Sequence, residues 1–308
     1  MAAVGQAVKE ACIVGMLADA LLPGKDKPLW PITWDQLAPL QTLEIHKVSP
    51  DQLSSIDPQQ FHQERLLFLL SLLVTARNYE IDTFIPPSWL IAHPLTYNTC
   101  PAELRPKNNN DTSSVGYGIL GYMFYHAEHR RAFVVFSGTA NGCMSMIDMD
   151  YVQVPYDELT NYQKDVVGHR GFYQAYLSIR PQLLNLLQDY LREEKLDQLV
   201  ICGHSLGGGM STVAAFDLAG LSPIHYSFAG PRVFNTVGSQ LYDQIVEFSV
   251  RVNNDSDIVP TMPMSVMPNG NSFNHAGNLK HFLYNMGNYS DNHSLAYLLH
   301  YQLAAITE

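Results

Sequence analysis

Apolar and polar positions form regular blocks in the second half of the chain, and each block predicts an element. The runs GYGILGYMFYH (116–126) and RAFVVFSG (131–138) are typical of two strands that pair around the polar turn AEHR. From 171 to 194, apolar residues recur at helical spacing. Pro181 lies inside this segment and is expected to restart or kink the helix.

Strands and helices then alternate to the end of this region. Short apolar runs predict buried strands, and a helix is expected after Ser205 and another near 237–244. Alternation of this kind indicates the α/β class, with a mostly parallel central sheet and helices on both of its faces. The three predicted strands are QLVICG (198–203), PIHYSFAG (223–230) and EFSVRVNN (247–254).

The N-terminal part lacks this regularity. Residues 1–60 contain scattered prolines and the stretch PLWPITWDQL, which predicts an extension of loops and short helices before a single domain over 61–308. The apolar segments at 11–22 and 66–76 are shorter than the roughly 20 residues of a membrane-spanning helix, so no transmembrane segment is expected. The first segment has no basic flank and contains Asp19, although the sequence leaves a signal peptide and secretion open.

Charge and cysteine content narrow the choice of partners and compartment. The net charge is −11 and EHRRA is the only basic run, which argues against a nucleic-acid partner. The 4 cysteines are widely spaced and form no CxxC pair, so neither a disulfide framework nor a zinc site is expected. This favours a reducing compartment, and we expect a cytoplasmic protein.

No cofactor or metal site is predicted either. GYGILG (116–121) fits the spacing GxGxxG, but no strand precedes it and no helical pattern follows it, as a dinucleotide site would need. His126 and His129 have no carboxylate or cysteine beside them that would complete a metal site.

The main chemical signal is the motif GHSLGGG, which follows the strand at 198–203. Gly203, Ser205 and Gly207 give GxSxG at a strand-to-helix junction, the setting of a nucleophilic serine on a strained turn. The structural alternative is a tight turn capped by a serine. His204 is expected to support the turn, because neighbours on so sharp a bend point apart.

A serine hydroxyl becomes a useful nucleophile when a histidine takes its proton and a carboxylate orients that histidine. Where such a serine stands on a strand-to-helix elbow, the acid follows the nucleophile along the chain and the histidine comes last. The segment RVNNDSDIVP offers Asp255 and Asp257. Order alone does not choose between them, or among the later histidines. These are His275, His281, His293 and His300.

Several motifs in register between 115 and 300 resemble the class 3 lipases: FSGT, GHRGFYQAY, GHSLGGG, SFAGPRVFN, NNDSDIVPTMP, FNHAG and NHSLAYLL. The resemblance implies an α/β-hydrolase fold, with Asp257 as the triad acid and His293 as the base. It also implies structural roles for His169 and His275, and leaves Asp255 as a turn residue.

The same resemblance implies an oxyanion hole built from the backbone N–H groups of Leu206 and Thr139. The chain departs from the family pattern at Ser137, where class 3 lipases usually carry an arginine. No tethering role of that charge is therefore expected here, whereas a backbone donor at Thr139 does not depend on it.

An unusually apolar connection follows the FSGT motif, at 140–156. In class 3 lipases the corresponding stretch holds a lid over the acyl groove. The alternative is a buried edge strand, because YVQVPY at its end alternates like one. A second methionine-rich loop, TMPMSVMP, is a candidate wall of the same groove. The lid and groove candidates are Met144, Met146, Ile147, Met149, Met262 and Met264.

Together these features predict a serine hydrolase that cleaves carboxylic esters of lipids, acylglycerols or phospholipids, through an acyl-enzyme. Transient contact with a lipid interface is expected, because an opened lid exposes apolar surface. A thioesterase or another acyl hydrolase on the same triad is an alternative, since fold and triad do not fix the acyl group. A lipase-like scaffold for binding or signalling is a third, disfavoured by the complete set of Ser, Asp and His.

Overall fold

The structure is a computed structural model, and it describes residues 90–97, 118–127, 130–139 and 147–293, except positions 162, 194, 284 and 286. The predicted N-terminal extension, the apolar segment at 66–76 and the boundary at residue 61 lie outside these residues.

A seven-stranded sheet forms the centre of the described part, in the order β1-β2-β3-β6-β7-β8-β9. The five strands from β3 to β9 are parallel, and β1 and β2 add an antiparallel edge. The predicted hairpin is therefore present. The strands are β1 (Leu90–Tyr97), β2 (Gly118–His126), β3 (Arg131–Phe136), β6 (Gln198–His204), β7 (Ile224–Phe228), β8 (Phe248–Asn254) and β9 (Asn278–Phe282).

The central strands are buried along almost their whole length. Every residue of β3 and of β7 is buried, and so are all residues of β6 after Gln198. Continuous apolar runs of this kind are what a sheet covered on both faces requires. This explains why the short runs in the sequence, which lack alternation, form strands.

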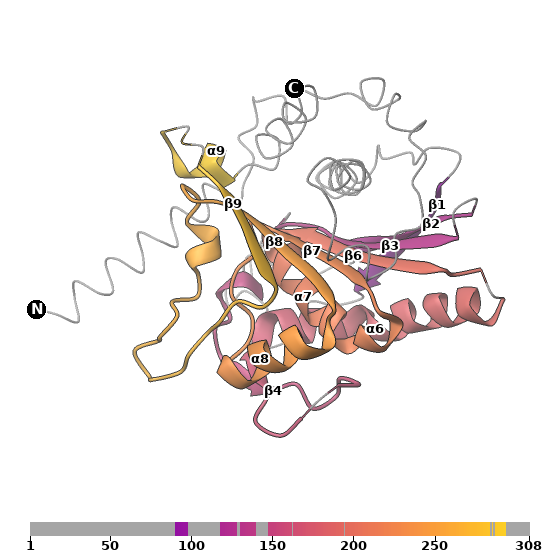
Figure 1. Ribbon diagram of the computed structural model, residues 1–308, viewed down its shortest axis with the longest axis horizontal. Coiled ribbons are helices and arrows are strands. Elements are labelled where there is room, and N and C mark those ends of the chain that lie inside the picture. The colour runs from indigo at the N-terminus through magenta and orange to yellow at the C-terminus, as the bar shows by residue number, and fades with distance from the viewer. Residues whose placement is uncertain are drawn as a thin grey trace, which may run out of the picture.

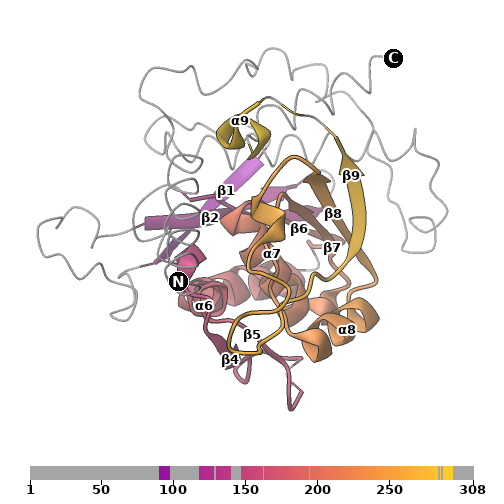
Figure 2. The same ribbon diagram turned by 90° about the vertical axis from the view of Figure 1, so that its left-hand side faces the viewer.

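Three helices connect consecutive parallel strands: α6 (Arg170–Arg192), α7 (Leu206–Asp217) and α8 (Thr236–Ile245). Since each connection advances in the same direction along the sheet, right-handed crossovers place all three on one face. Figures 1 and 2 show them packed together on that face. The described residues thus contain one of the two predicted helical layers.

Helix α6 begins where the N–H of Phe172 donates to the ring of His169. Its apolar stripe continues through Tyr176, Ile179 and Leu183, at spacings of three and four residues. Pro181 lies on the exposed side of the same continuous helix. The predicted restart at this proline is therefore wrong. The helix runs through it because the buried stripe on the opposite side is unbroken.

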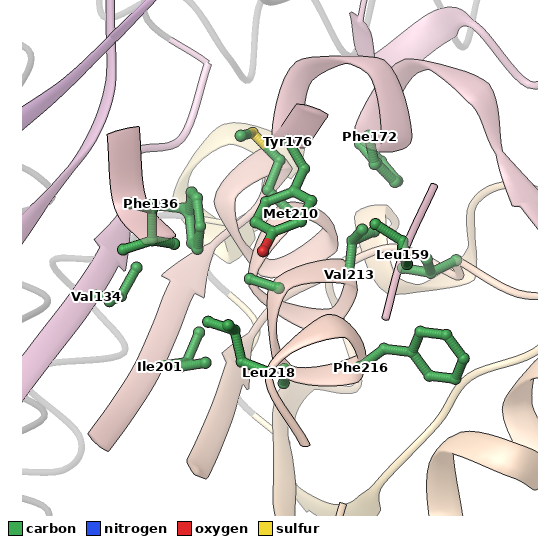
Figure 3. Close-up of a cluster of buried hydrophobic side chains, with 14 of the residues drawn as sticks. Val134, Phe136, Leu159, Phe172, Tyr176, Ile201, Met210, Val213, Phe216 and Leu218 are labelled. Carbon is green, nitrogen blue, oxygen red and sulfur yellow. The ribbon is translucent and has the colours of Figure 1, made fainter. Parts of the chain in front are cut away.

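Helix α7 is buried on all sides, between the sheet and α6 (Figure 3). Figure 3 shows Phe136 and Ile201 of the sheet on one side of α7, and Leu159 beside Val213 on the other. Phe136 also meets Tyr176 of α6, with ring centroids 6.4 Å apart. A fully buried helix fixes the position of its first residue, and this first residue follows Ser205.

Candidate active site

Ser205 occupies a sharp turn between β6 and α7. Its backbone has φ 58° and ψ −124°, a region that non-glycine residues rarely adopt. The neighbouring glycines make this turn possible. A Cβ atom on Gly203 would lie 2.1 Å from the carbonyl oxygen of Gly207, and one on Gly207 would lie 2.3 Å from that of Phe136.

The side chains of Ser205, His293 and Asp257 form one hydrogen-bonded chain. The Nε2 atom of His293 lies 2.8 Å from the Ser205 Oγ atom, and its Nδ1 atom lies 2.6 Å from Asp257 Oδ2. Each of the three residues is at most 4% exposed. Since a carboxylate only accepts, Nδ1 carries the proton and Nε2 accepts from the serine hydroxyl. The structure therefore brings together the three residues predicted as the triad.

The other candidate acid and histidines lie in different contacts. Asp255 pairs with His281 at 2.9 Å on the surface, with side chains 47% and 60% exposed. His275 bonds to the carbonyl oxygen of Pro260. His300 lies outside the described residues. The sequence order left these alternatives open, and the geometry separates them from Ser205.

The segment that carries Asp257 is anchored at consecutive carbonyl groups. The N–H of Val259, first residue of the short helix η6 (Val259–Thr261), donates to Asp257 Oδ1 at 2.9 Å. Arg232 then donates from its backbone N–H to Met262 and from Nη1 to Thr261 and to Pro263.

The segment that carries His293 is tied to the acid segment by two asparagines. Asn254 donates from Nδ2 to the carbonyl oxygen of Asn292 at 3.0 Å, and Asn292 donates to that of Ser256 at 3.2 Å. His204 bonds to the carbonyl oxygen of His293 itself, at 3.0 Å.

The segments that carry the two predicted oxyanion donors pack against each other. Gly207 packs against the carbonyl groups of Phe136 and Ser137, which places the end of β3 against the start of α7. Leu206 and Thr139 are fully buried. Ser137, at the position where the arginine is missing, donates from Oγ to the Leu120 carbonyl at 2.9 Å and so links β3 to β2.

Asp148 joins this region as a residue that the sequence did not single out. The Thr139 hydroxyl donates to its Oδ2 atom at 2.5 Å. Burial raises the pKa of Asp148 to about 7, although the bond from Thr139 and the nearby His293 act in the opposite direction. No motif marks this aspartate, since its role depends on a contact with Thr139, nine residues earlier in the chain.

The predicted lid is only partly described. Met144 and Met146 lie outside the described residues. Ile147 is 1% exposed and belongs to the hydrophobic core, and its carbonyl packs against Gly171 of α6. Four residues after the half-buried Met149, the chain reaches the short strand β4 (Gln153–Pro155), which pairs with β5 (Val167–His169).

Ile147 is thus a core residue in this conformation. The end of the segment forms the short strand β4, which is half-buried to exposed and not the buried edge strand of the alternative interpretation. Between them, Asp150 forms a bidentate ion pair with Arg170 at 2.7 Å. Of the groove candidates after Asp257, Met262 ends η6 and is half-buried, whereas Met264 is 40% exposed.

Two kinds of feature are missing from the described part of the chain. None of its helices is long and apolar enough to span a bilayer. Among the same residues, no group of three or more His, Cys, Asp or Glu side chains could hold a metal ion.

The comparison with protein families finds a match in the central region of the chain. Residues 133–267 match the family model described as Lipase (class 3). Over this region the chain is similar to the class 3 lipases. The region contains Ser205, Asp257 and both predicted oxyanion residues, whereas His293 follows its end.

Fungal lipases are among the similar proteins. The secreted mono- and diacylglycerol lipase of Malassezia globosa is 28% identical over 152 residues, which cover 46% of this chain and 50% of the relative. That of Penicillium cyclopium is 31% identical over 100 residues, 32% of each chain. The chain therefore spans at most half the length of these relatives.

The solved triacylglyceride lipase of Rhizomucor miehei has a TM-score of 0.55 and 19% identity, covering 76% of this chain and 84% of that one. This likeness confirms the predicted α/β-hydrolase fold.

The predicted cytoplasmic location is wrong, because the relatives of known location are named secreted lipases. The prediction depended on the absence of a disulfide pattern. A disulfide pattern marks small secreted domains that cannot build a sufficient hydrophobic core. A larger domain buries enough apolar surface to fold without disulfides, so their absence does not indicate the compartment.

Proposed function

We propose that this chain is a serine carboxylic-ester hydrolase that acts on acyl esters of lipids. The observation that carries the proposal is the buried chain of hydrogen bonds from Ser205 through His293 to Asp257. In a buried site this arrangement activates a hydroxyl for attack on an acyl carbon. The catalytic domain extends from about residue 61 to 308 in this proposal.

In the first half of the reaction, Ser205 Oγ attacks the ester carbonyl carbon while His293 Nε2 takes the hydroxyl proton. Asp257 stabilises the imidazolium that results. The oxyanion accepts hydrogen bonds from the backbone N–H groups of Leu206 and Thr139. The bond from the acyl carbon to the alcohol oxygen then breaks, and His293 returns the proton to the leaving alcohol.

The second half releases the acyl group. Water attacks the acyl-serine, His293 takes a proton from this water, and the fatty acid leaves as Ser205 regains its hydrogen. These steps use only side chains and backbone groups of the chain.

Acylglycerols are the proposed substrates, supported by the class 3 lipase match and by relatives named mono- and diacylglycerol lipases. We place the enzyme outside the cell, as its named secreted relatives are. Transient contact with a lipid interface is part of this proposal, because acylglycerols collect in aggregates and the ester must leave them to reach a buried serine.

The test is hydrolysis of a matched panel by purified protein: mono-, di- and triacylglycerols, a phospholipid, an acyl thioester and a short soluble ester. We expect turnover of acylglycerols that Ser205→Ala abolishes. Turnover of the thioester alone would replace this substrate class with the thioesterase alternative. Equal rates for wild type and Ser205→Ala would contradict the whole proposal.

A further inference from the structure

Three histidines, His169 and His204 buried and His275 half-buried, share one arrangement around the site. In each of them, the Nε2 atom bonds to a backbone carbonyl oxygen, and that carbonyl belongs to a segment carrying a different part of the site. His169 bonds to Asp148 at 3.2 Å, His204 to His293 at 3.0 Å, and His275 to Pro260 at 2.7 Å. A carbonyl can only accept, so all three rings carry their proton on Nε2.

His169 holds the residue that contacts Thr139, one of the two predicted oxyanion residues. Its Nδ1 atom accepts the N–H of Phe172 at the start of α6, which leaves Nε2–H for the carbonyl of Asp148. The carboxyl group of that aspartate accepts the hydroxyl of Thr139. The ring therefore connects the rigid start of α6 to the residue that bears a predicted oxyanion donor.

His204 and His275 act on the base and the acid. His204 directly precedes the nucleophile, and its bond to the His293 carbonyl fixes the backbone of the base relative to the serine. His275 holds Pro260 in η6, and the first N–H of η6 orients the Asp257 carboxylate. Arg232 holds the next carbonyls of the same segment.

All three rings are kept neutral. Burial lowers the pKa of His169 and of His275 to about 3, and holds the pKa of His204 well below its usual range. A neutral ring keeps a single proton, so each donor has one fixed direction over the physiological pH range.

We propose that His169, His204 and His275 are positioning residues that set the oxyanion segment, the base and the acid, respectively, through Nε2–H bonds to backbone carbonyls. The inference rests on the proposed function. It predicts that loss of each donor slows the activation of Ser205, beyond any loss of stability, because a small displacement of a reacting group costs rate.

A fourth histidine provides the matched control. His225 is also fully buried, and burial lowers its pKa to about 3. Its ring nitrogens bond to the side chains of Ser211, Ser249 and Tyr242, and none of these is a predicted site residue. Replacing it removes a neutral ring of the same kind, but no hydrogen bond to a backbone carbonyl of the site.

The experiment compares leucine and glutamine at each of the four positions. Glutamine keeps an N–H donor near the place of Nε2, whereas leucine removes it. The readouts are the rate at which a fluorophosphonate labels Ser205, followed by intact mass, and kcat and KM for a soluble p-nitrophenyl ester. Thermal unfolding measures stability separately. Where a leucine variant does not fold, the asparagine variant, with a shorter reach, replaces it.

We expect the leucine variants at 169, 204 and 275 to lower the labelling rate and kcat by about 10- to 100-fold at little change in KM. Glutamine should restore most of this loss. His225→Leu should lower the unfolding temperature and leave the labelling rate and kcat unchanged. Leucine variants that lose only stability, as His225→Leu does, would overturn the inference. A wild-type protein that labels no faster than Ser205→Ala would instead contradict the proposed function.

Discussion

The Thr139 hydroxyl lies 2.5 Å from Asp148 Oδ2, so a side chain of the predicted oxyanion residue is held by a carboxyl group whose pKa burial raises to about 7. The raised pKa means that the fold binds a proton at Asp148 more tightly than the unfolded chain does. The contribution of this group to stability is therefore complete below pH 4 and is lost as the pH rises through 7.

Asp148→Asn should remove this pH dependence. Relative to wild type, the variant should gain stability between pH 5 and pH 8, because it carries no charge that burial disfavours. Urea unfolding at both pH values measures the difference. Asp255→Asn, at an exposed aspartate, is the control. A gap between Asp148→Asn and wild type that stays constant with pH would show that Asp148 does not titrate in this way.

The same carboxyl group should matter for catalysis. Asp148→Ala leaves the Thr139 hydroxyl without its acceptor, and we expect kcat for a soluble ester to fall about 10-fold or more as the oxyanion donor loses its anchor. Asparagine retains an acceptor oxygen, so Asp148→Asn should lose less. Equal kcat values for the alanine variant and wild type would remove Asp148 from the account of the oxyanion hole.

Acid should unfold the protein steeply because of the buried histidines. Their pKa values lie at about 3 for His169, His225 and His275, below the ordinary value of 6.5. The unfolded chain therefore binds the extra protons, and the stability present above pH 6.5 is lost as the pH falls towards 3. Each histidine adds a slope of up to about 1.4 kcal/mol per pH unit.

His225→Gln should reduce the dependence of the unfolding free energy on pH by the contribution of one histidine, up to about 1.4 kcal/mol per pH unit. The free energy of unfolding in urea, measured at several values between pH 7 and pH 5, gives the slope for both proteins. An unchanged slope in His225→Gln would mean that His225 is not kept neutral by burial.

Ile147→Ser should destabilise the fold by about 3 kcal/mol, because it removes a core side chain and buries a hydroxyl. Met264→Ser, at a side chain that is 40% exposed, should change stability by less than about 0.5 kcal/mol. Denaturant unfolding of both variants measures this difference. If Ile147→Ser were as stable as Met264→Ser, Ile147 would not be a core residue and would again be a candidate lid residue.

Local patterns predict the strands β2, β3, β6, β7 and β8 and the helices α6, α7 and α8, because each buried run and each apolar stripe is complete within its own segment. The site could be predicted only as a set of candidates. Asp255 and Asp257 are two residues apart on one loop. The turn of this loop directs Asp255 to the surface and Asp257 to His293, and the sequence alone does not show this difference. Asp148 and Arg232 contact residues that are distant in the sequence, Thr139 and Pro263 respectively, and no local sequence pattern indicates such contacts.

The pair Asp257→Asn and Asp255→Asn tests the central claim most directly, through kcat/KM for a soluble ester at equal fold content. Asp257 is 4% exposed and its carboxylate holds the Nδ1 proton of His293, whereas Asp255 pairs with His281 at the surface. We predict a loss of about 10³-fold or more for Asp257→Asn, since an amide favours the wrong tautomer of the base, and a change of less than about threefold for Asp255→Asn. Equal losses in the two variants, or an Asp257→Asn protein that keeps wild-type activity, would contradict the assignment of the triad.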